Sequence, residues 1–98
     1  MVKIAVCEDN PITRRLIVEM INNIKLLTVF TVSQFSSKAD FNDDEPLNSD
    51  IILMSCDFNS KYGKNGFEIT RSLREKGCNA NIIFITSFSE QGILKYVK

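Results

Sequence analysis

The stretch from Asp50 to Gly66 reads Asp-Ile-Ile-Leu-Met-Ser-Cys-Asp-Phe-Asn-Ser-Lys-Tyr-Gly-Lys-Asn-Gly. An apolar run leads to a carboxylate, Asp57, and then breaks into a loop of small, polar and glycine residues. A continuous apolar run is typical of a strand that is buried on both faces of a parallel sheet. Open α/β sheets bind their ligands at the carboxyl ends of such strands. We therefore expect Asp57 to be a functional carboxylate.

The totals of the sequence limit both the number of domains and the class of function. A chain of 98 residues is expected to form one domain. Equal numbers of basic and acidic residues, 12 of each, leave no basic excess for binding nucleic acid. The apolar runs are too short to span a membrane. The first residues also turn acidic too early for a signal peptide, so the expected location is the cytoplasm.

Histidine is absent from the sequence, and cysteine occurs three times. The lack of histidine excludes Ser-His-Asp and Cys-His catalysis and most zinc sites. It also means that the chain cannot donate a phosphoryl group from histidine, although it can receive one. Cys7, Cys56 and Cys78 are expected to be buried, reduced thiols, because free cysteine is usually buried and none of the three forms a Cys-x-x-Cys pair.

Four segments rich in apolar or β-branched residues predict strands. They lie at residues 3–7, 27–35, 51–56 and 81–86. Predicted helices follow the strands, which gives the order βαβαβαβα. Strands that alternate with helices form a parallel sheet with right-handed crossovers. The expected fold class is therefore α/β.

The first predicted helix begins at Pro11, after Asn10 as its cap. Apolar residues at a spacing of four should face the sheet from this helix. They are Ile12, Leu16, Met20 and Ile24, and Ile17 and Ile21 widen the stripe. The other helices are expected at residues 36–41, at residues 66–76 after an Asn65 cap, and around Ile93, Leu94 and Val97.

Polar side chains follow three of the predicted strands. They are Glu8 and Asp9 after the first, Asp57 after the third and Thr86 at the end of the fourth. The carboxyl ends of parallel strands share one edge of a sheet, so these residues should converge. Glu8 and Asp9 have a simpler alternative role, because negative charge is also favoured just before a helix.

Three carboxylates at one edge repel each other unless a cation lies between them. Oxygen ligands suit Mg²⁺, which keeps several waters and accepts a phosphate oxygen. A carboxylate beside this metal can attack phosphorus and form an aspartyl phosphate. Thr86 would then donate a hydrogen bond to the phosphoryl oxygens. A second acidic group, Asp43, Asp44 and Glu45, is expected to be a solvated loop, with a cation site as the alternative.

Four segments carry a resemblance to a known family. They are Ile4-Ala-Val-Cys-Glu-Asp-Asn-Pro11, Asp57-Phe-Asn59, Asn65-Gly-Phe-Glu68 and Asn81-Ile-Ile-Phe-Ile-Thr-Ser87. Together they resemble the receiver domain of two-component response regulators. The resemblance is closest to regulators with LytTR-type DNA-binding domains, among them the accessory gene regulator (Agr-type) regulators of quorum sensing. It covers essentially the whole chain, residues 1–98.

The resemblance implies a flavodoxin-like, doubly wound sheet with strand order 2-1-3-4 and a role in signalling rather than as a metabolic enzyme. It implies that Glu8 and Asp9 hold Mg²⁺ together with Asp57 and the backbone carbonyl of Asn59. Asp57 would accept a phosphoryl group from a sensor histidine kinase, and Thr86 would be the switch hydroxyl. The output would be control of transcription, with DNA contacted only through a domain that this sequence does not contain.

Ser55 competes with Asp57 for the acceptor position. In many receivers the acceptor lies five residues after an acid that opens the strand, and five residues after Asp50 is Ser55. The loop length favours Asp57, because Gly66 lies nine residues beyond Asp57 but eleven beyond Ser55. A serine acceptor position would make the chain a pseudo-receiver, and the alternative function is therefore a phosphorylation-independent interaction module.

Compared with the receivers it resembles, the sequence stops before a fifth strand, its lysine and a last helix. Lys95 and Lys98 lie in the fourth predicted helix and are not expected to replace that lysine. The fourth strand then becomes an apolar edge through Ile82, Ile83, Phe84 and Ile85. An unprotected edge strand pairs readily with another chain, so we expect self-association through this strand.

Overall fold

The structure is a computed structural model that describes residues 1–24, 29–41 and 46–86. Four strands form one parallel sheet in the order β2-β1-β3-β4. They are β1 (Val2–Cys7), β2 (Phe30–Phe35), β3 (Ile51–Ser55) and β4 (Asn81–Ile85). The predicted α/β class and the strand order 2-1-3-4 are confirmed. No helix in these described ranges is long and apolar enough to cross a membrane.

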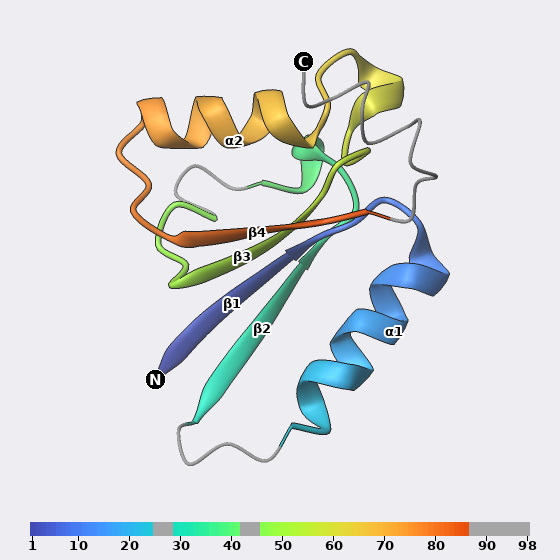
Figure 1. Ribbon diagram of the computed structural model, residues 1–98, viewed down its shortest axis with the longest axis vertical. Coiled ribbons are helices and arrows are strands. Elements are labelled where there is room, and N and C mark those ends of the chain that lie inside the picture. Colours follow the sequence, from blue (N-terminus) through green and yellow to red (C-terminus); the bar gives the residue numbers. More distant parts are fainter. Residues whose placement is uncertain (25–28, 42–45, 87–98) are drawn as a thin grey trace.

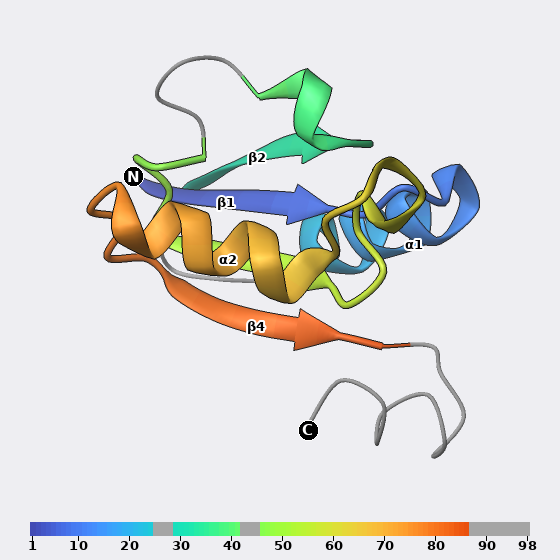
Figure 2. The same ribbon diagram turned by 90° about the horizontal axis from the view of Figure 1, so that it is seen from above.

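The helices lie on opposite faces of the sheet (Figure 2). They are α1 (Pro11–Asn22) and α2 (Gly66–Glu75), with two 3-10 turns, η1 (Lys38–Asp40) and η2 (Ser60–Tyr62). Helix α1 follows β1, and α2 links β3 to β4 (Figure 1). The residues of β1 alternate between the two faces, so that Ile4 and Val6 belong to the core cluster under α1. Ala5 and Cys7 belong to the larger cluster under α2.

The larger core cluster fixes the position of the central strand. Ile52 and Met54 of β3 are fully buried against Ile69 and Leu73 of α2. Phe58, directly after the candidate acceptor, is also fully buried in this cluster. Burial of a side chain of this size stabilises the fold by about 2 kcal/mol. The loop that carries Asp57 is therefore fixed to the core by its neighbour.

All three cysteines are buried and unpaired, as predicted. Burial raises the pKa of the Cys7 thiol far above its usual range. A thiol without access to water stays protonated and unreactive. Cys7 therefore serves as a core residue, and nothing in its surroundings favours the thiolate.

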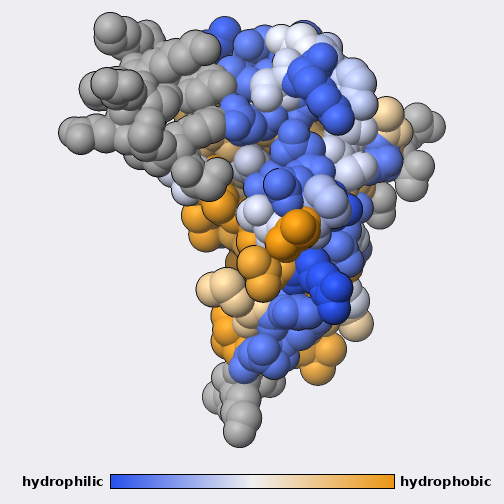
Figure 3. Space-filling view, turned by 90° about the vertical axis from the view of Figure 1, so that its right-hand side faces the viewer, coloured by the Kyte–Doolittle hydropathy of each residue, from blue (hydrophilic) through white to orange (hydrophobic). Residues whose placement is uncertain are grey.

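The main row of the predicted inner stripe of the first helix is wrong, whereas Ile17 and Ile21, which were predicted to widen it, do lie on the buried side. The residues of the main row are largely exposed instead: Ile12 is 71%, Leu16 55%, Met20 68% and Ile24 52% exposed. The buried side of α1 consists of Ile21, with Ile17 and Val18 packed beside it. Apolar residues cover such a broad arc of this helix that spacing alone does not show which part meets the sheet. Figure 3 views the side of the molecule that carries α1 and shows hydrophobic atoms exposed there among hydrophilic ones.

The second predicted helix is shorter than expected. Residues 36–41 contain only the 3-10 turn η1, which begins after Ser37. The Asp40 carboxylate accepts hydrogen bonds from the backbone N–H groups of Ser36 and Ser37, and these bonds favour a tight turn over a continued helix. Hydrogen bonds from Ser36 hold the pKa of Asp40 below its usual range. The acidic residues 43–45 and the last predicted helix lie outside the described residues.

Candidate functional site

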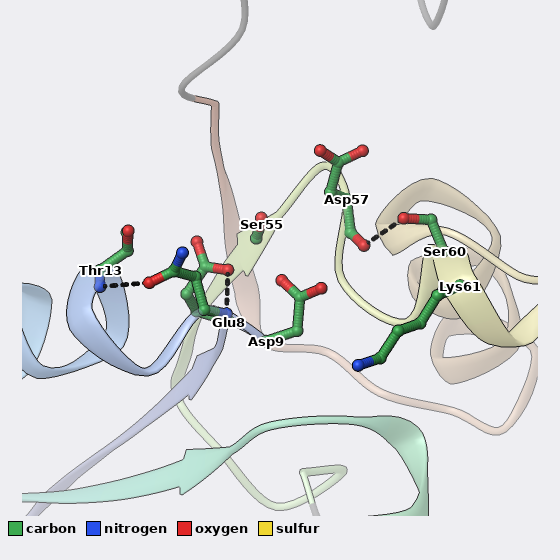
Figure 4. A pocket seen from close by; sticks show the side chains of 8 residues that line it. Glu8, Asp9, Thr13, Ser55, Asp57, Ser60 and Lys61 are labelled. Atoms are coloured by element: carbon green, nitrogen blue, oxygen red, sulfur yellow. Dashed lines mark hydrogen bonds between the residues drawn. The ribbon is translucent and has the colours of Figure 1, made fainter.

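The carboxyl ends of β1 and β3 meet at one pocket. In the parallel register Cys7 pairs with Met54, which places Glu8 next to Ser55 at the ends of the two strands. The pocket has a volume of about 390 Å³. Its walls include Glu8, Asp9, Ser55, Asp57, Ser60 and Lys61, with Asn10 and Thr13 at the start of α1 (Figure 4). Glu8 and Asp9 after β1 and Asp57 after β3 therefore converge on one pocket, as predicted.

Glu8 is the most enclosed acid of the pocket, with 7% of its surface exposed. Its Oε2 accepts a hydrogen bond of 3.0 Å from the backbone N–H of Asn10. Burial and the neighbouring Asp9 carboxyl raise the pKa of Glu8, and the Asn10 N–H and the Ser55 side chain oppose this shift. A raised pKa means that the charged form of Glu8 is disfavoured, mainly by burial and also by Asp9 beside it. A bound cation would stabilise this charged form.

The start of α1 positions both acids. The Oδ1 atom of Asn10 accepts hydrogen bonds of 3.0 Å from the N–H groups of Ile12 and Thr13. This cap fixes the direction in which the chain leaves β1. The Arg14 guanidinium also donates to the Glu8 carbonyl at 2.8 Å. The backbone of the acid pair is therefore held by the strand on one side and by the helix on the other.

Asp57 lies in the turn after β3, at the outer side of the pocket. Its carbonyl accepts hydrogen bonds from the Ser60 N–H at 2.9 Å and from the Ser60 hydroxyl at 2.6 Å. These bonds close the turn that carries the carboxylate. In Figure 4 the Asp57 carboxylate points away from Glu8, and the Asp9 carboxylate lies on the side of the pocket between them.

Ser55 lies deeper in the same pocket than Asp57. It is the last residue of β3 and is 6% exposed. Its side chain interacts with the Glu8 carboxyl and lowers the pKa of Glu8. The two candidate acceptors thus share one pocket but differ in position. Ser55 is next to the buried acid Glu8, while Asp57 is half-buried at the outer side of the pocket.

Asn59 and Thr86 do not line this pocket in the described part of the chain. Asn59 has a left-handed backbone with φ of 66°. Its side chain accepts a hydrogen bond from the Lys38 N–H at 3.0 Å, and its carbonyl accepts one from the Tyr62 N–H at 3.0 Å. Thr86, just after β4, donates to the Cys56 thiol and lowers its pKa, although burial raises that pKa more strongly. Asn59 and Thr86 therefore lie outside the lining of the pocket, and each has a hydrogen-bond partner elsewhere.

The oxygen donors fit a metal ion held by two carboxylates and water. Glu8 and Asp9 are adjacent carboxyl groups on an open pocket, which is how Mg²⁺ is commonly bound in proteins. In the described ranges, no three Cys, Asp or Glu residues are close enough together to hold a metal by themselves. Asp57 would therefore join this set only through water or after a movement of its side chain.

Lys61 and Ser60 are pocket residues that sequence reasoning did not identify. The motifs assign no role to either position. The available signal is local: both follow Asp57 within four residues, in a loop interrupted by Gly63. A short loop that turns back after a strand end keeps its residues near that strand end. The position of Lys61, four residues after Asp57, is therefore the sequence signal that places it near the candidate acceptor.

Comparisons with known proteins give information on the fold alone. No protein-family model matches the chain. No curated protein matches it either. A solved structure, described as a yeast Spc42 trimeric coiled-coil segment fused to another solved structure, is similar to this chain with a TM-score of 0.65 and 17% identity. The similarity covers 97% of this chain and 57% of that chain, so the present chain corresponds to little more than half of the other one.

Proposed function

We propose that the chain is a signalling receiver domain that accepts a phosphoryl group on Asp57 from a sensor histidine kinase. The observation that carries the proposal is the open pocket in which Asp57 lies with two further carboxylates, Glu8 and Asp9. The sheet order β2-β1-β3-β4 with helices on both faces agrees with the flavodoxin-like arrangement of such domains. The motif resemblance supplies the identity of the reaction.

The transfer step needs little from the protein besides position and charge. An oxygen of the Asp57 carboxylate attacks the phosphorus, and the bond from phosphorus to the histidine nitrogen breaks. The nitrogen keeps the electron pair, and an acyl phosphate remains on Asp57. Asp57 is half-buried on the lining of the pocket, and the turn closed by Ser60 limits the movement of its backbone.

Mg²⁺ belongs to this proposal, with Glu8, Asp9 and Asp57 as acidic ligands and the Asn59 carbonyl as a backbone ligand. When bound, it would neutralise charge on the transferring group. The Asn59 carbonyl already accepts one hydrogen bond, but a carbonyl oxygen has two lone pairs. Thr86 would leave the Cys56 thiol to donate its hydroxyl hydrogen to the phosphoryl oxygens.

The biological part of the proposal follows the resemblance to Agr-type regulators. Phosphorylation in the cytoplasm would change the region after β4 and thereby control transcription, as in quorum sensing. DNA would be contacted by a separate domain. The chain would promote its own modification but would not be a metabolic enzyme.

A phosphorylation-independent interaction module is the second candidate. It is favoured by the positions of the two possible acceptors, since Ser55 is the residue next to Glu8. The Asp57 carboxylate points away from that acid (Figure 4). In this case the pocket would keep its acids without performing phosphoryl transfer.

Labelling with a small phosphodonor tests the proposed function. The protein is incubated with phosphoramidate and Mg²⁺, and base-labile phosphoryl groups are measured by intact-protein mass spectrometry. We expect labelling that a chelator prevents and that Asp9→Asn reduces by about tenfold or more, because a metal-bound carboxylate is lost. Glu68→Gln, at the exposed start of α2, serves as the control and should label normally. No labelling would favour the second candidate, and labelling that does not need the metal would contradict the proposed magnesium site.

A further inference from the structure

Lys61 is the basic residue among the described side chains that line the pocket. In Figure 4 its side chain extends from η2 beside Asp9, and its ammonium group lies on the opposite side of Asp9 from the Asp57 carboxylate. The ammonium nitrogen is 5.4 Å from the centroid of the Tyr62 ring. An aromatic ring at this distance attracts a cation weakly and limits the directions available to it.

The loop joins the backbone of Lys61 closely to the backbone of the acceptor. Ser60 binds the Asp57 carbonyl through both its N–H and its hydroxyl. The Tyr62 N–H binds the Asn59 carbonyl, and the Gly63 N–H binds the Ser60 carbonyl. These consecutive bonds make the segment from Asp57 to Gly63 a compact turn. The backbone of Lys61 therefore moves with the backbone of Asp57.

The charge of the pocket gives this lysine a partner once a phosphoryl group is present. Glu8, Asp9 and Asp57 are all acids, and Lys61 is their basic neighbour in the lining. A phosphoryl group adds further negative charge and oxygen acceptors. A lysine ammonium suits such a group because it is a compact charge with three donors on a flexible stem.

We propose that Lys61 binds the phosphoryl oxygens at this site, during transfer to Asp57 and in the acyl phosphate. The proposal rests on the proposed function and adds a specific residue to it. With phosphoramidate as donor, the Asp57 oxygen forms the new bond to phosphorus, and the donor nitrogen, which carries three protons in the zwitterionic form, leaves as ammonia with the electron pair of the broken P–N bond. Lys61 keeps its proton throughout and acts by charge and hydrogen bonding.

Lys64 offers a matched control on the same loop. It is exposed and three residues from Lys61, and it does not belong to the lining of the pocket. Lys64→Gln changes the net charge of the protein as Lys61→Gln does. A difference between the two variants therefore reports the position of the charge rather than its total. Lys61→Arg keeps the charge at the site and tests whether the charge is sufficient.

The test is the initial labelling rate of the full chain as a function of phosphoramidate concentration with Mg²⁺ present. We expect Lys61→Gln to lower the rate at low donor concentration by about tenfold, the value of one hydrogen bond from a charged group. Lys61→Arg should restore most of the rate, and Lys64→Gln should match the wild type. Added salt should slow the wild type more than Lys61→Gln, because screening acts on a charge that the variant lacks.

The outcomes separate this proposal from the one on which it rests. If the wild type labels on Asp57 and Lys61→Gln behaves like Lys64→Gln, Lys61 has no part in the reaction and the proposal is wrong. If the wild type does not label, the proposed function fails and the role of Lys61 fails with it. Equal salt dependence of the wild type and Lys61→Gln would also contradict a direct charge interaction.

Discussion

Gly66 determines how closely α2 can approach the candidate site. A Cβ atom added to Gly66 would lie 2.1 Å from the carbonyl oxygen of Ser55 and 3.2 Å from Cγ of Met54. The Gly66 N–H also donates to the Cys56 carbonyl at 3.1 Å. Any larger residue must therefore move the helix away from the end of β3. The glycine of the Asn65-Gly66 pair is therefore required by the close approach of α2 to the end of β3.

Gly66→Ala is expected to destabilise the fold by about 2 kcal/mol, the usual effect of overpacking a rigid site. Gly77→Ala provides the comparison, because Gly77 has open space around its Cα and only its positive φ of 94° opposes the substitution. That change should destabilise by about 1 kcal/mol. Urea unfolding of both variants measures the difference. Equal values, or a neutral Gly66→Ala, would show that the close contact is relieved at little cost.

At this scale the sequence identified the acids but not the whole pocket. Glu8, Asp9 and Asp57 could be predicted to converge because they end neighbouring strands, and the pocket contains all three. The sequence could not predict that Asn59 and Thr86 have other contacts, since these depend on the η1 backbone and on the Cys56 thiol. The role of Ser55 or Asp57 as acceptor stays a prediction.

Helix α1 shows why an element can be predicted while its orientation is not. Asn10, Pro11 and the apolar spacing correctly predict the start and type of the helix. Its buried side is decided by contact with Ile4 and Val6 of β1, which are distant in sequence. The exposed arc from Ile12 to Met20 therefore has the composition of a core without its position.

Substitutions in α1 should follow the observed burial rather than the spacing. Ile21→Ala removes a side chain that is 8% exposed and should destabilise the fold by about 3 kcal/mol. Leu16→Ala should change stability by no more than about 0.5 kcal/mol, since Leu16 is on the surface. Chemical denaturation of the two variants checks this order. A larger loss from Leu16→Ala would show that the helix packs by its predicted stripe.

At the scale of the whole molecule, the alternation of strands and helices was enough to predict a parallel α/β sheet, whereas the strand order 2-1-3-4 was predicted from the family resemblance. This alternation does not predict what lies on the outer side of β4. In the described sheet, β4 is the last strand and pairs with β3. Ile83 and Phe84 of this strand are 54% and 39% exposed. Among the described residues no strand pairs with the outer side of β4, and a strand edge beside exposed apolar side chains favours pairing with a second copy. We propose self-association through β4.

Ile83→Lys is expected to shift the protein toward the monomer in sedimentation velocity measured over a range of concentrations. A lysine on an edge strand opposes pairing because its charge would be brought close to the same charge on the partner. Ile12→Lys is the control, since Ile12 is similarly exposed but lies on α1. Association that is lost with Ile12→Lys and kept with Ile83→Lys would place the contact on the helix instead.

The most direct test of the central claim is the position of the phosphoryl group. Wild type, Asp57→Asn and Ser55→Ala are treated with phosphoramidate and Mg²⁺, digested, and mapped by tandem mass spectrometry. The account predicts a base-labile group on Asp57 in the wild type and in Ser55→Ala, and none in Asp57→Asn. A base-stable group on Ser55, or equal labelling of Asp57→Asn and wild type, would contradict the account.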